Sequence, residues 1–474
     1  MSQQSRGRSW IALMGVSIAA AFASIALTAG PARASEVDVL IEKLAQKGLL
    51  TRLEAETMRG DIEMQEKASY IKHREETNPW LNDLQAKGDV RLRYETFSRE
   101  DEDASDRSRY RIRLRWGLEK RFDDDWRAGF RLATGAANDP TSTNQTLTSE
   151  FGQKTIGVDA AYAIWTPTNH VKEFIPATAL VEIGGGKVNN PYAKIASTII
   201  WDGDVTPEGI YEKYDLRLSE ADGGMSYTDI NVIGSQFIVS EDSDFSPGDF
   251  ETFGYGVGIT HQWMKDHWWT LQTQYYDWQD YIAFEKGGNS AVAAALGGND
   301  RELSDLKILN FYGAVNYLAE TPWFETQNVN IYADFAYNTA GGDPSSENDV
   351  DFTDVTLRNN PRPDENMAFN VGGTFGKAKD PGSWAATYEY YYIEPNAVNG
   401  TFSESDLGLG FANNKGHHLV YKYIVAPNVE LNLGVWMVER INTEIENYFA
   451  SSDVRVNGDD NQIIRTQADL VYKF

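Results

Sequence analysis

The stretch from Arg107 to Phe122 reads RSRYRIRLRWGLEKRF and alternates apolar with cationic side chains. The apolar positions are Tyr110, Ile112, Leu114, Trp116 and Leu118, and the cationic positions between them are Arg109, Arg111, Arg113 and Arg115. Successive side chains of a strand point to opposite faces of the sheet. The stretch therefore predicts a strand with one tall apolar face and one face made of arginine.

The same period of two recurs from Gln85 to the end of the chain. About sixteen segments show it, near residues 88–97, 108–120, 125–134, 154–166, 178–188, 208–218, 225–240, 251–263, 267–279, 306–318, 327–339, 366–377, 382–393, 416–426, 428–440 and 462–474. Short connections such as Met264–Asp266 and Ala426–Asn428 alternate with long acidic ones such as 241–249 and 341–365. Short turns at one end and long loops at the other are typical of membrane β-barrels.

The composition excludes several classes of protein. The 474 residues contain no cysteine, which removes disulfide, thiolate and Cys-zinc chemistry. The formal net charge of −27 argues against nucleic-acid binding. No apolar run after residue 30 is long enough for a transmembrane helix. The 24 Tyr, 13 Trp and 40 Gly favour strands and turns.

Residues 1–34 have the pattern of a cleaved signal peptide. Arg6 and Arg8 form a basic region, Trp10–Leu27 is apolar, and Ala32-Arg33-Ala34 is a cleavage site. Residues 35–84 are expected to form a short periplasmic helical segment, because an apolar stripe is followed by a capping box at Thr51–Glu54. This segment would serve either as a coiled coil or as a periplasmic tether.

We therefore expect an all-β fold over residues 85–474. In lipid, only helices and closed barrels give every backbone group a partner, and helices are excluded here. The predicted fold is a transmembrane antiparallel β-barrel of about sixteen strands, with eighteen as the alternative count. The expected location is the outer membrane of a Gram-negative cell, in contact with its lipid.

The chain resembles the putative porins of Gram-negative bacteria from end to end. The segments that carry the resemblance are LIEKLAQKGLLTRLEAE (Leu40–Glu56), GDVRLRYETF (Gly88–Phe97), the Arg-rich strand, WDGDVTPEG (Trp201–Gly209) and the terminal LVYKF. The resemblance implies an outer-membrane channel for small solutes. It also implies that the barrel-assembly machinery recognises the terminal Phe474 and, by analogy with sixteen-stranded porins, that the chain forms a homotrimer.

Arginines on three consecutive predicted strands form the most informative set of side chains. The predicted pore-lining residues are Arg91, Arg93, Arg109, Arg111, Arg113, Arg115, Arg127 and Arg131. An arginine facing lipid near the bilayer midplane costs roughly 2–4 kcal/mol, so these residues are expected to face the lumen. There they would either favour anionic solutes or pair with lumen-facing acids such as Asp159, Glu389, Glu430 and Asp469.

The connection from Lys187 to Glu208 contains an unusually apolar stretch, Ile195–Trp201. In sixteen-stranded porins a long loop folds into the lumen, and the resemblance implies the same for this connection. The expected constriction residues are Tyr192, Lys194, Trp201, Asp202 and Asp204.

The leading hypothesis is a passive porin for small hydrophilic solutes, with a lumen narrowed by the 187–208 connection and lined on one wall by arginine. One alternative is a channel selective for anions such as phosphate, or for sugars. Another is a structural protein that tethers the membrane through residues 35–78. A barrel enzyme would need a Ser-His or Asp-His pair near the rim, and the sequence offers no convincing spacing. No cofactor, metal or nucleic-acid partner is expected.

Overall fold

The computed structural model describes residues 82–99, 106–137, 139–148, 150–167, 174, 176, 179–193, 198–240, 250–279, 306–320, 326–340, 365–406, 412–441 and 462–474. Contacts divide the chain into two units, Met1–Leu84 and Gln85–Phe474. The expected signal peptide, and the expected helical segment up to residue 81, lie outside the described residues. Nearly all of the described residues belong to the second unit.

Antiparallel strands make up nearly all of the regular structure in the described part of the second unit. The strands are β1 (Leu84–Arg99), β2 (Arg107–Arg121), β3 (Trp126–Thr134), β4 (Gln145–Thr146), β5 (Ile156–Trp165), β6 (Ala179–Lys187), β7 (Glu208–Ala221), β8 (Ser226–Ser240), β9 (Phe250–Met264), β10 (His267–Gln279), β11 (Leu306–Ala319), β12 (Gln327–Asn338), β13 (Met367–Gly376), β14 (Trp384–Ile393), β15 (Asn414–Ala426), β16 (Val429–Arg440) and β17 (Ile463–Lys473). The 3-10 turn η2 (Asp222–Gly224) joins β7 to β8. Within the described residues, no helix is long and apolar enough to cross a membrane.

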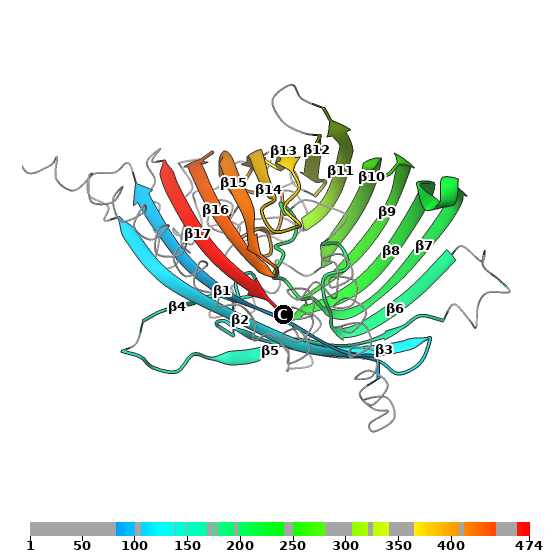
Figure 1. Ribbon diagram of the computed structural model, residues 1–474, viewed down its shortest axis with the longest axis horizontal. Helices are drawn as coiled ribbons and strands as arrows, with labels where there is room; N and C mark the ends of the chain where they lie inside the picture. The colour runs from blue at the N-terminus through cyan, green and yellow to red at the C-terminus, as the bar shows by residue number, and fades with distance from the viewer. Residues whose placement is uncertain are drawn as a thin grey trace, which may run out of the picture. The chain divides into compact units, whose positions relative to one another are not determined.

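The sheet closes on itself because β1 has a strand partner on both edges. It pairs with β2 on one side and with β17 on the other, in a register that runs from Asp89 opposite Lys473 to Arg99 opposite Ile463. In Figure 1 the red β17 accordingly lies beside the blue β1. The two-residue β4 pairs with β2 beyond the end of β3 and adds no position to the circuit. The expected closed antiparallel barrel of sixteen strands is thus confirmed.

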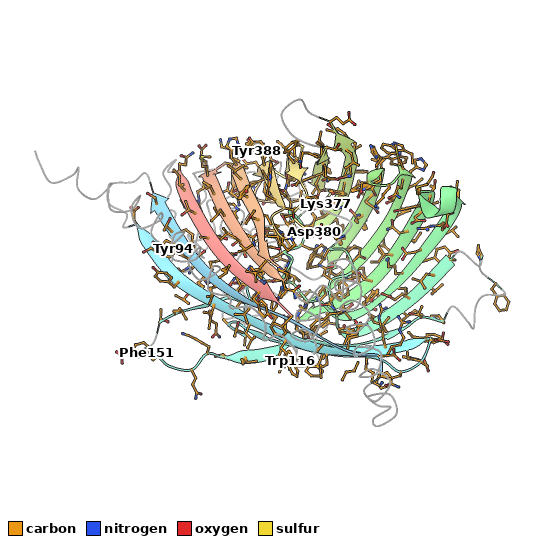
Figure 2. All side chains as sticks on the ribbon, viewed as in Figure 1. Tyr94, Trp116, Phe151, Lys377, Asp380 and Tyr388 are labelled. Carbon is orange, nitrogen blue, oxygen red and sulfur yellow. The ribbon has the colours of Figure 1, made fainter. Side chains whose placement is uncertain are left out.

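Side chains alternate between an apolar outer face and a largely polar inner face. On β10 the buried inner positions are Thr270, Gln272, Gln274, Tyr276 and Trp278, whereas the outward Leu271 is 58% exposed. Figure 2 shows Trp116 and Tyr388 among the side chains on the outer surface, where both are exposed. The period of two in the sequence therefore becomes two chemically distinct faces of the barrel wall.

The tightest turns lie at the same end of the barrel. Two residues join β9 to β10 and β15 to β16, and the second residue of each turn has a positive φ, 60° for Asp266 and 65° for Asn428. Asp and Asn tolerate this left-handed conformation better than most residues do. The expected short connections at Met264–Asp266 and Ala426–Asn428 are therefore hairpin turns.

Glycines on the inner face let aromatic rings lie close against the wall. A side-chain carbon at Gly184 would lie 2.2 Å from the Tyr211 ring, and one at Gly434 would lie 2.4 Å from the Trp436 ring. These rings cover the glycine backbone of a strand, so they occupy less of the space at the centre of the barrel.

Gly88 lies where the barrel closes. Its N–H donates to the Phe474 carbonyl at 2.9 Å, and the Phe474 N–H donates to the Gly88 carbonyl at 3.0 Å. A side-chain carbon at Gly88 would lie 2.4 Å from the backbone oxygen of Arg115 and 2.6 Å from the Phe474 ring. The seam has no room for a side chain at this position.

We predict that Gly88→Ala lowers the free energy of unfolding by about 1–3 kcal/mol, because it overpacks the closing seam. The measurement is the guanidinium midpoint followed by tryptophan fluorescence. Gly185→Ala is the matched control, since its added carbon would have no neighbour closer than 3.7 Å. Equal midpoints for the two variants would contradict the prediction.

Candidate functional site

The eight arginines predicted from the sequence lie on the inner faces of β1, β2 and β3. Arg93 and Arg113 are only 5% and 7% exposed, whereas the outward Leu92 and Tyr110 are 44% and 54% exposed. Guanidinium groups buried to this degree need charged partners, because removing an ion from water costs several kcal/mol. The identity of those partners decides what this arginine wall can do.

Asp89 of β1 holds two arginines of β2. Its carboxylate lies 2.8 Å from Arg113 Nη2 and 2.7 Å from Arg115 Nε. A second carboxylate, Asp204, reaches the same pair from the 187–208 connection, 3.1 Å from Arg115 and 3.6 Å from Arg113. Two carboxylates therefore balance two guanidinium groups at this point of the wall.

Glu95 is a second centre of charge on β1, and it is fully buried. It pairs with Arg109, lies 3.6 Å from Arg111 and lies 2.8 Å from Arg465 of β17. The guanidinium groups of Arg109 and Arg465 also lie over the Phe97 ring, at 5.3 and 5.1 Å from its centroid. Glu95 thus contacts three cations, of which Arg465 also contacts Asp406 at 2.7 Å.

Arg93 bridges the barrel wall to a segment of chain inside the barrel. It forms a two-point contact with Asp469 of β17, at 2.8 Å for each bond. Its Nη1 also lies 3.4 Å from Asp406, in the connection that follows β14. Arg91 is held nearby by Asn144 Oδ1, at 2.7 Å.

The two arginines of β3 are paired with neighbouring strands. Arg127 lies 2.5 Å from Glu182 of β6, and Arg131 pairs with Asp159 of β5. Of the four acids named from the sequence as possible partners, Asp159 and Asp469 do hold arginines of the wall. Glu389 instead contacts a histidine and Glu430 contacts two lysines.

The 187–208 connection packs against the inner side of the barrel wall. Its buried apolar residues are Val188, Tyr192, Ile199, Ile200, Trp201 and Val205. Tyr192 Oη lies 2.9 Å from Ser235 Oγ of β8, and its ring meets Tyr276 of β10 edge to face at 5.2 Å. A buried aromatic cluster therefore attaches one side of this connection to the wall, while Asp204 contacts the arginines. Lys194 lies outside the described residues.

The connection after β14 also enters the barrel, which the sequence did not indicate. Within it, Ala397, Val398 and Phe402 are buried in the same apolar cluster as Trp201. The Asp202 N–H donates to the Phe402 carbonyl at 2.6 Å, and the Glu404 N–H donates to the Thr198 carbonyl at 3.0 Å. The two connections are therefore joined backbone to backbone inside the barrel.

A third inserted segment, Gly135–Asn144, leaves the wall between β3 and β4. Ser142, Thr143 and Asn144 are buried, and Thr143 Oγ1 donates to Asp204 at 3.0 Å. Because β4 then continues in the position of β3 beside β2, the segment is an excursion from one strand position. Its sequence, GAANDPTSTN, carries turn residues but no long apolar run, so neither length nor hydropathy marks it as inserted.

Asp202 and Glu404 bring two carboxyl groups together where the inserted connections meet. Burial and the neighbouring Asp204 raise the pKa of Asp202 to about 7. Burial and Asp202 raise the pKa of Glu404 well above its usual range. Burial would also raise the pKa of Asp406, but Arg465 and Arg93 outweigh burial and lower it. At neutral pH the pair can therefore retain a proton while Asp406 stays ionised.

Several charged residues of the site were not predicted from the sequence: Asp89, Glu95, Glu182, Glu404, Asp406 and Arg465. Arg465 lies 2.7 Å from Asp406 and 2.8 Å from Glu95, and is 3% exposed. Its position on β17 alternates with Ile464 and Thr466, so the period of two could have placed it on the inner face. Asp406 carries no comparable signal, because it lies in a connection.

Comparison with known proteins identifies the family of this chain. The family model described as putative porin matches residues 99–303 and 303–456. The chain belongs to the putative porin family. Among solved structures, it is similar to Pseudomonas putida OprB at high pH, with 10% identity over 84% of this chain and 96% of that chain and a TM-score of 0.47. It is also similar to a triple mutant of the Rhodopseudomonas blastica porin, with 10% identity over 82% and 100% and a TM-score of 0.39. No curated protein matches.

Membership of the putative porin family, together with the closed barrel, establishes a porin-type channel. The same two findings imply the outer membrane as its location and a channel rather than an enzyme as its class.

We predict that the conductance of this porin rises with pH around a midpoint near 7. An acid whose pKa is raised in the folded state keeps its proton below that value, so Asp202 loses its proton as pH rises through about 7. The ionised Asp202 then repels the ionised Asp406 of the other connection, which pushes the two connections apart. The measurement is single-channel conductance from about pH 5 to about pH 9.

The double variant Asp202→Asn/Glu404→Gln is the control for this transition, because amides do not titrate. Its conductance should vary little over the same range of pH. A flat wild-type profile, or the same transition in both proteins, would refute the link to this carboxyl pair.

Proposed function

We propose that this protein is a general porin, through which small hydrophilic solutes diffuse passively. The observation that carries the proposal is a closed barrel with a polar inner face, into which three connections fold. Passive diffusion requires a polar route, and the paired charges of the wall supply one without a deep binding site. In this proposal the constriction is formed by the connection with Tyr192, Trp201, Asp202 and Asp204, and also by Asp406 on the connection after β14.

The arginine wall is proposed to line the narrow part of the route. Nine arginines, counting Arg465, meet seven carboxylates there, namely Asp89, Glu95, Asp159, Glu182, Asp204, Asp406 and Asp469. This near balance supports weak selectivity and a transverse field over strong selection of anions. A phosphate-selective channel would need guanidinium groups without carboxylate partners, so we place it second.

The tether function and the coiled coil both depend on residues 35–81, which lie outside the described part of the chain. A homotrimer, and recognition of Phe474 by the barrel-assembly machinery, are proposed from the family resemblance alone. Chemical crosslinking of the protein in native membranes would test the trimer.

We predict that Asp204→Asn/Asp406→Asn shifts ion selectivity towards anions. The two carboxylates contact Arg113, Arg115, Arg93 and Arg465, so their removal leaves those cations under-neutralised. The reversal potential in a tenfold salt gradient should move towards the anion limit by roughly 10 mV or more, since each residue changes the local charge by one unit. Planar-bilayer recording measures it.

Asp380→Asn is the matched control, because Asp380 lies in the short turn between β13 and β14, and its side chain is exposed (Figure 2). Its reversal potential should equal that of the wild type. An unchanged potential in the double variant would contradict the role given to the two acids. Absence of conductance in the wild type would sink the porin proposal itself.

A further inference from the structure

The barrel wall is lower where β6 ends and β7 begins, because the neighbouring strands β5 and β8 extend further. The first β6 partner along β5 is Ala161, opposite Lys187, so Ile156–Ala160 of β5 extend beyond the end of β6. On the other side, β7 begins its pairing with Gly209 opposite Phe237, so Ile238–Ser240 of β8 extend beyond it. In the described residues, these two strand ends therefore border a notch above the β6–β7 pair.

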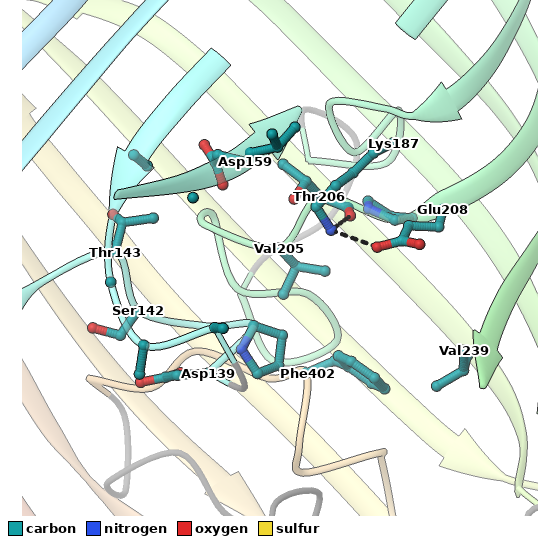
Figure 3. Close-up of a pocket in the computed structure, with 18 of the residues that line it drawn as sticks. Asp139, Ser142, Thr143, Asp159, Lys187, Val205, Thr206, Glu208, Val239 and Phe402 are labelled. Atoms are coloured by element: carbon teal, nitrogen blue, oxygen red, sulfur yellow. Dashed lines mark hydrogen bonds and ion pairs between the residues drawn. The ribbon is translucent and has the colours of Figure 1, made fainter. Parts of the chain in front are cut away.

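A cavity of about 590 Å³ occupies this notch. Its floor is the end of the β6–β7 pair, where Lys187 Nζ donates to Glu208 at 2.9 Å and to the Thr206 carbonyl at 3.1 Å. Figure 3 shows side chains from separate stretches of chain around it, among them Thr143, Asp159, Val205 and Val239. The volume lies within the range of small-molecule sites.

The lining of the cavity crosses the wall from its outer face to its inner face. Val158 and Ile238 line it and belong to the outer surface, at 59% and 49% exposed. Trp201 and Phe402, which also line it, belong to the aromatic cluster inside the barrel. Apolar residues of the lining thus lie on both the outer face and the inner face of the wall, with charged residues such as Asp159 and Lys187 between them.

The first residues of β5 are exposed where they line the cavity. Gly157 lines the cavity, and a side-chain carbon built on it would meet no atom within 4 Å. Ile156, Gly157 and Val158 are all exposed in succession, whereas a strand with neighbours on both sides hides every second residue. The edge of β5 facing β6 is therefore uncovered by the described residues.

We propose that this notch is a lateral window that binds amphiphiles entering from the surrounding lipid. The ligand class follows from two constraints. The apolar residues of the lining, among them Val158, Ile238 and Phe402, favour an alkyl or aromatic body. The strand edges, with Lys187 and Glu208 below them, require a hydrogen-bonding head group, because backbone groups facing hydrocarbon cost several kcal/mol when unsatisfied. The proposal adds a second, lipid-side ligand to the aqueous route and does not depend on ion conduction.

The chain lacks cysteine, so single-cysteine variants of the full-length protein report one position each. The variant that tests the window is Val239→Cys, on the inner face of β8 and in the lining of the cavity. Its matched control is Val420→Cys, a partly exposed valine on β15 that lines a separate cavity of about 290 Å³. Leu271→Cys, on the outer face of β10, is the reference for lipid access.

The probe is N-dodecylmaleimide in phosphatidylcholine vesicles containing the folded protein. Each buried CH₂ of its chain contributes about 0.8 kcal/mol to membrane partitioning, so the probe reacts from the lipid phase. Val239→Cys should react at least about tenfold faster than Val420→Cys and approach the rate of Leu271→Cys. Equal rates for the two valine positions would overturn the window.

Gly157→Leu supplies a second arm, because its side chain enters open space and narrows the notch. The Gly157→Leu/Val239→Cys protein should react about tenfold more slowly with the dodecyl probe, with Leu271→Cys unaffected. An unchanged rate would refute the lateral route.

A sulfonated maleimide confined to water distinguishes entry from lipid from entry through the aqueous lumen. Fast labelling of Val239→Cys by that probe alone would overturn the window and leave the porin proposal intact.

Discussion

Closure of the backbone ladder is the constraint on which the rest of this protein depends. In hydrocarbon an unpaired N–H or C=O costs several kcal/mol, so any strand edge without a neighbouring strand needs another hydrogen-bonding partner. The seam between β1 and β17 satisfies that condition along eleven paired positions and ends at the contact of Gly88 with Phe474. Because the seam joins the two ends of the barrel unit, the whole unit must be in register before the last pair can form.

Closure has a direct consequence for the charges. Outward positions must be apolar, so every arginine of β1, β2 and β3 that the sequence placed in the wall is turned inwards, where it loses much of its water. A buried guanidinium group needs a carboxylate within hydrogen-bonding distance. Asp89 and Glu95 supply part of this charge from the wall, and Asp204 and Asp406 supply more from inserted chain. The arginine wall and the inserted connections therefore stabilise each other.

The inserted connections also explain why the inner face is not uniformly polar. Near the ends of β8, β10, β11 and β14 the inner wall carries Phe237, Trp278, Ile308 and Ile393, which pack with Trp201 and Phe402. This apolar cluster holds the connections on one side, and ion pairs hold them on the other. The described parts of these connections are thus anchored on both sides, and the notch beside β5 and β8 lies on the apolar side.

The sequence by itself determined the local geometry: the strands, their two faces, the short turns and the inward position of the eight arginines. These follow from covalent geometry, since a period of two fixes which residues share a face. The tertiary structure alone decided which carboxylate meets which arginine, that Gly135–Asn144 and the connection after β14 enter the barrel, and where the rim is interrupted. Arg465 and Asp406 meet across 59 residues of chain. Such contacts depend on the register in which the barrel closes. The alternating pattern along a single strand contains no information about that register.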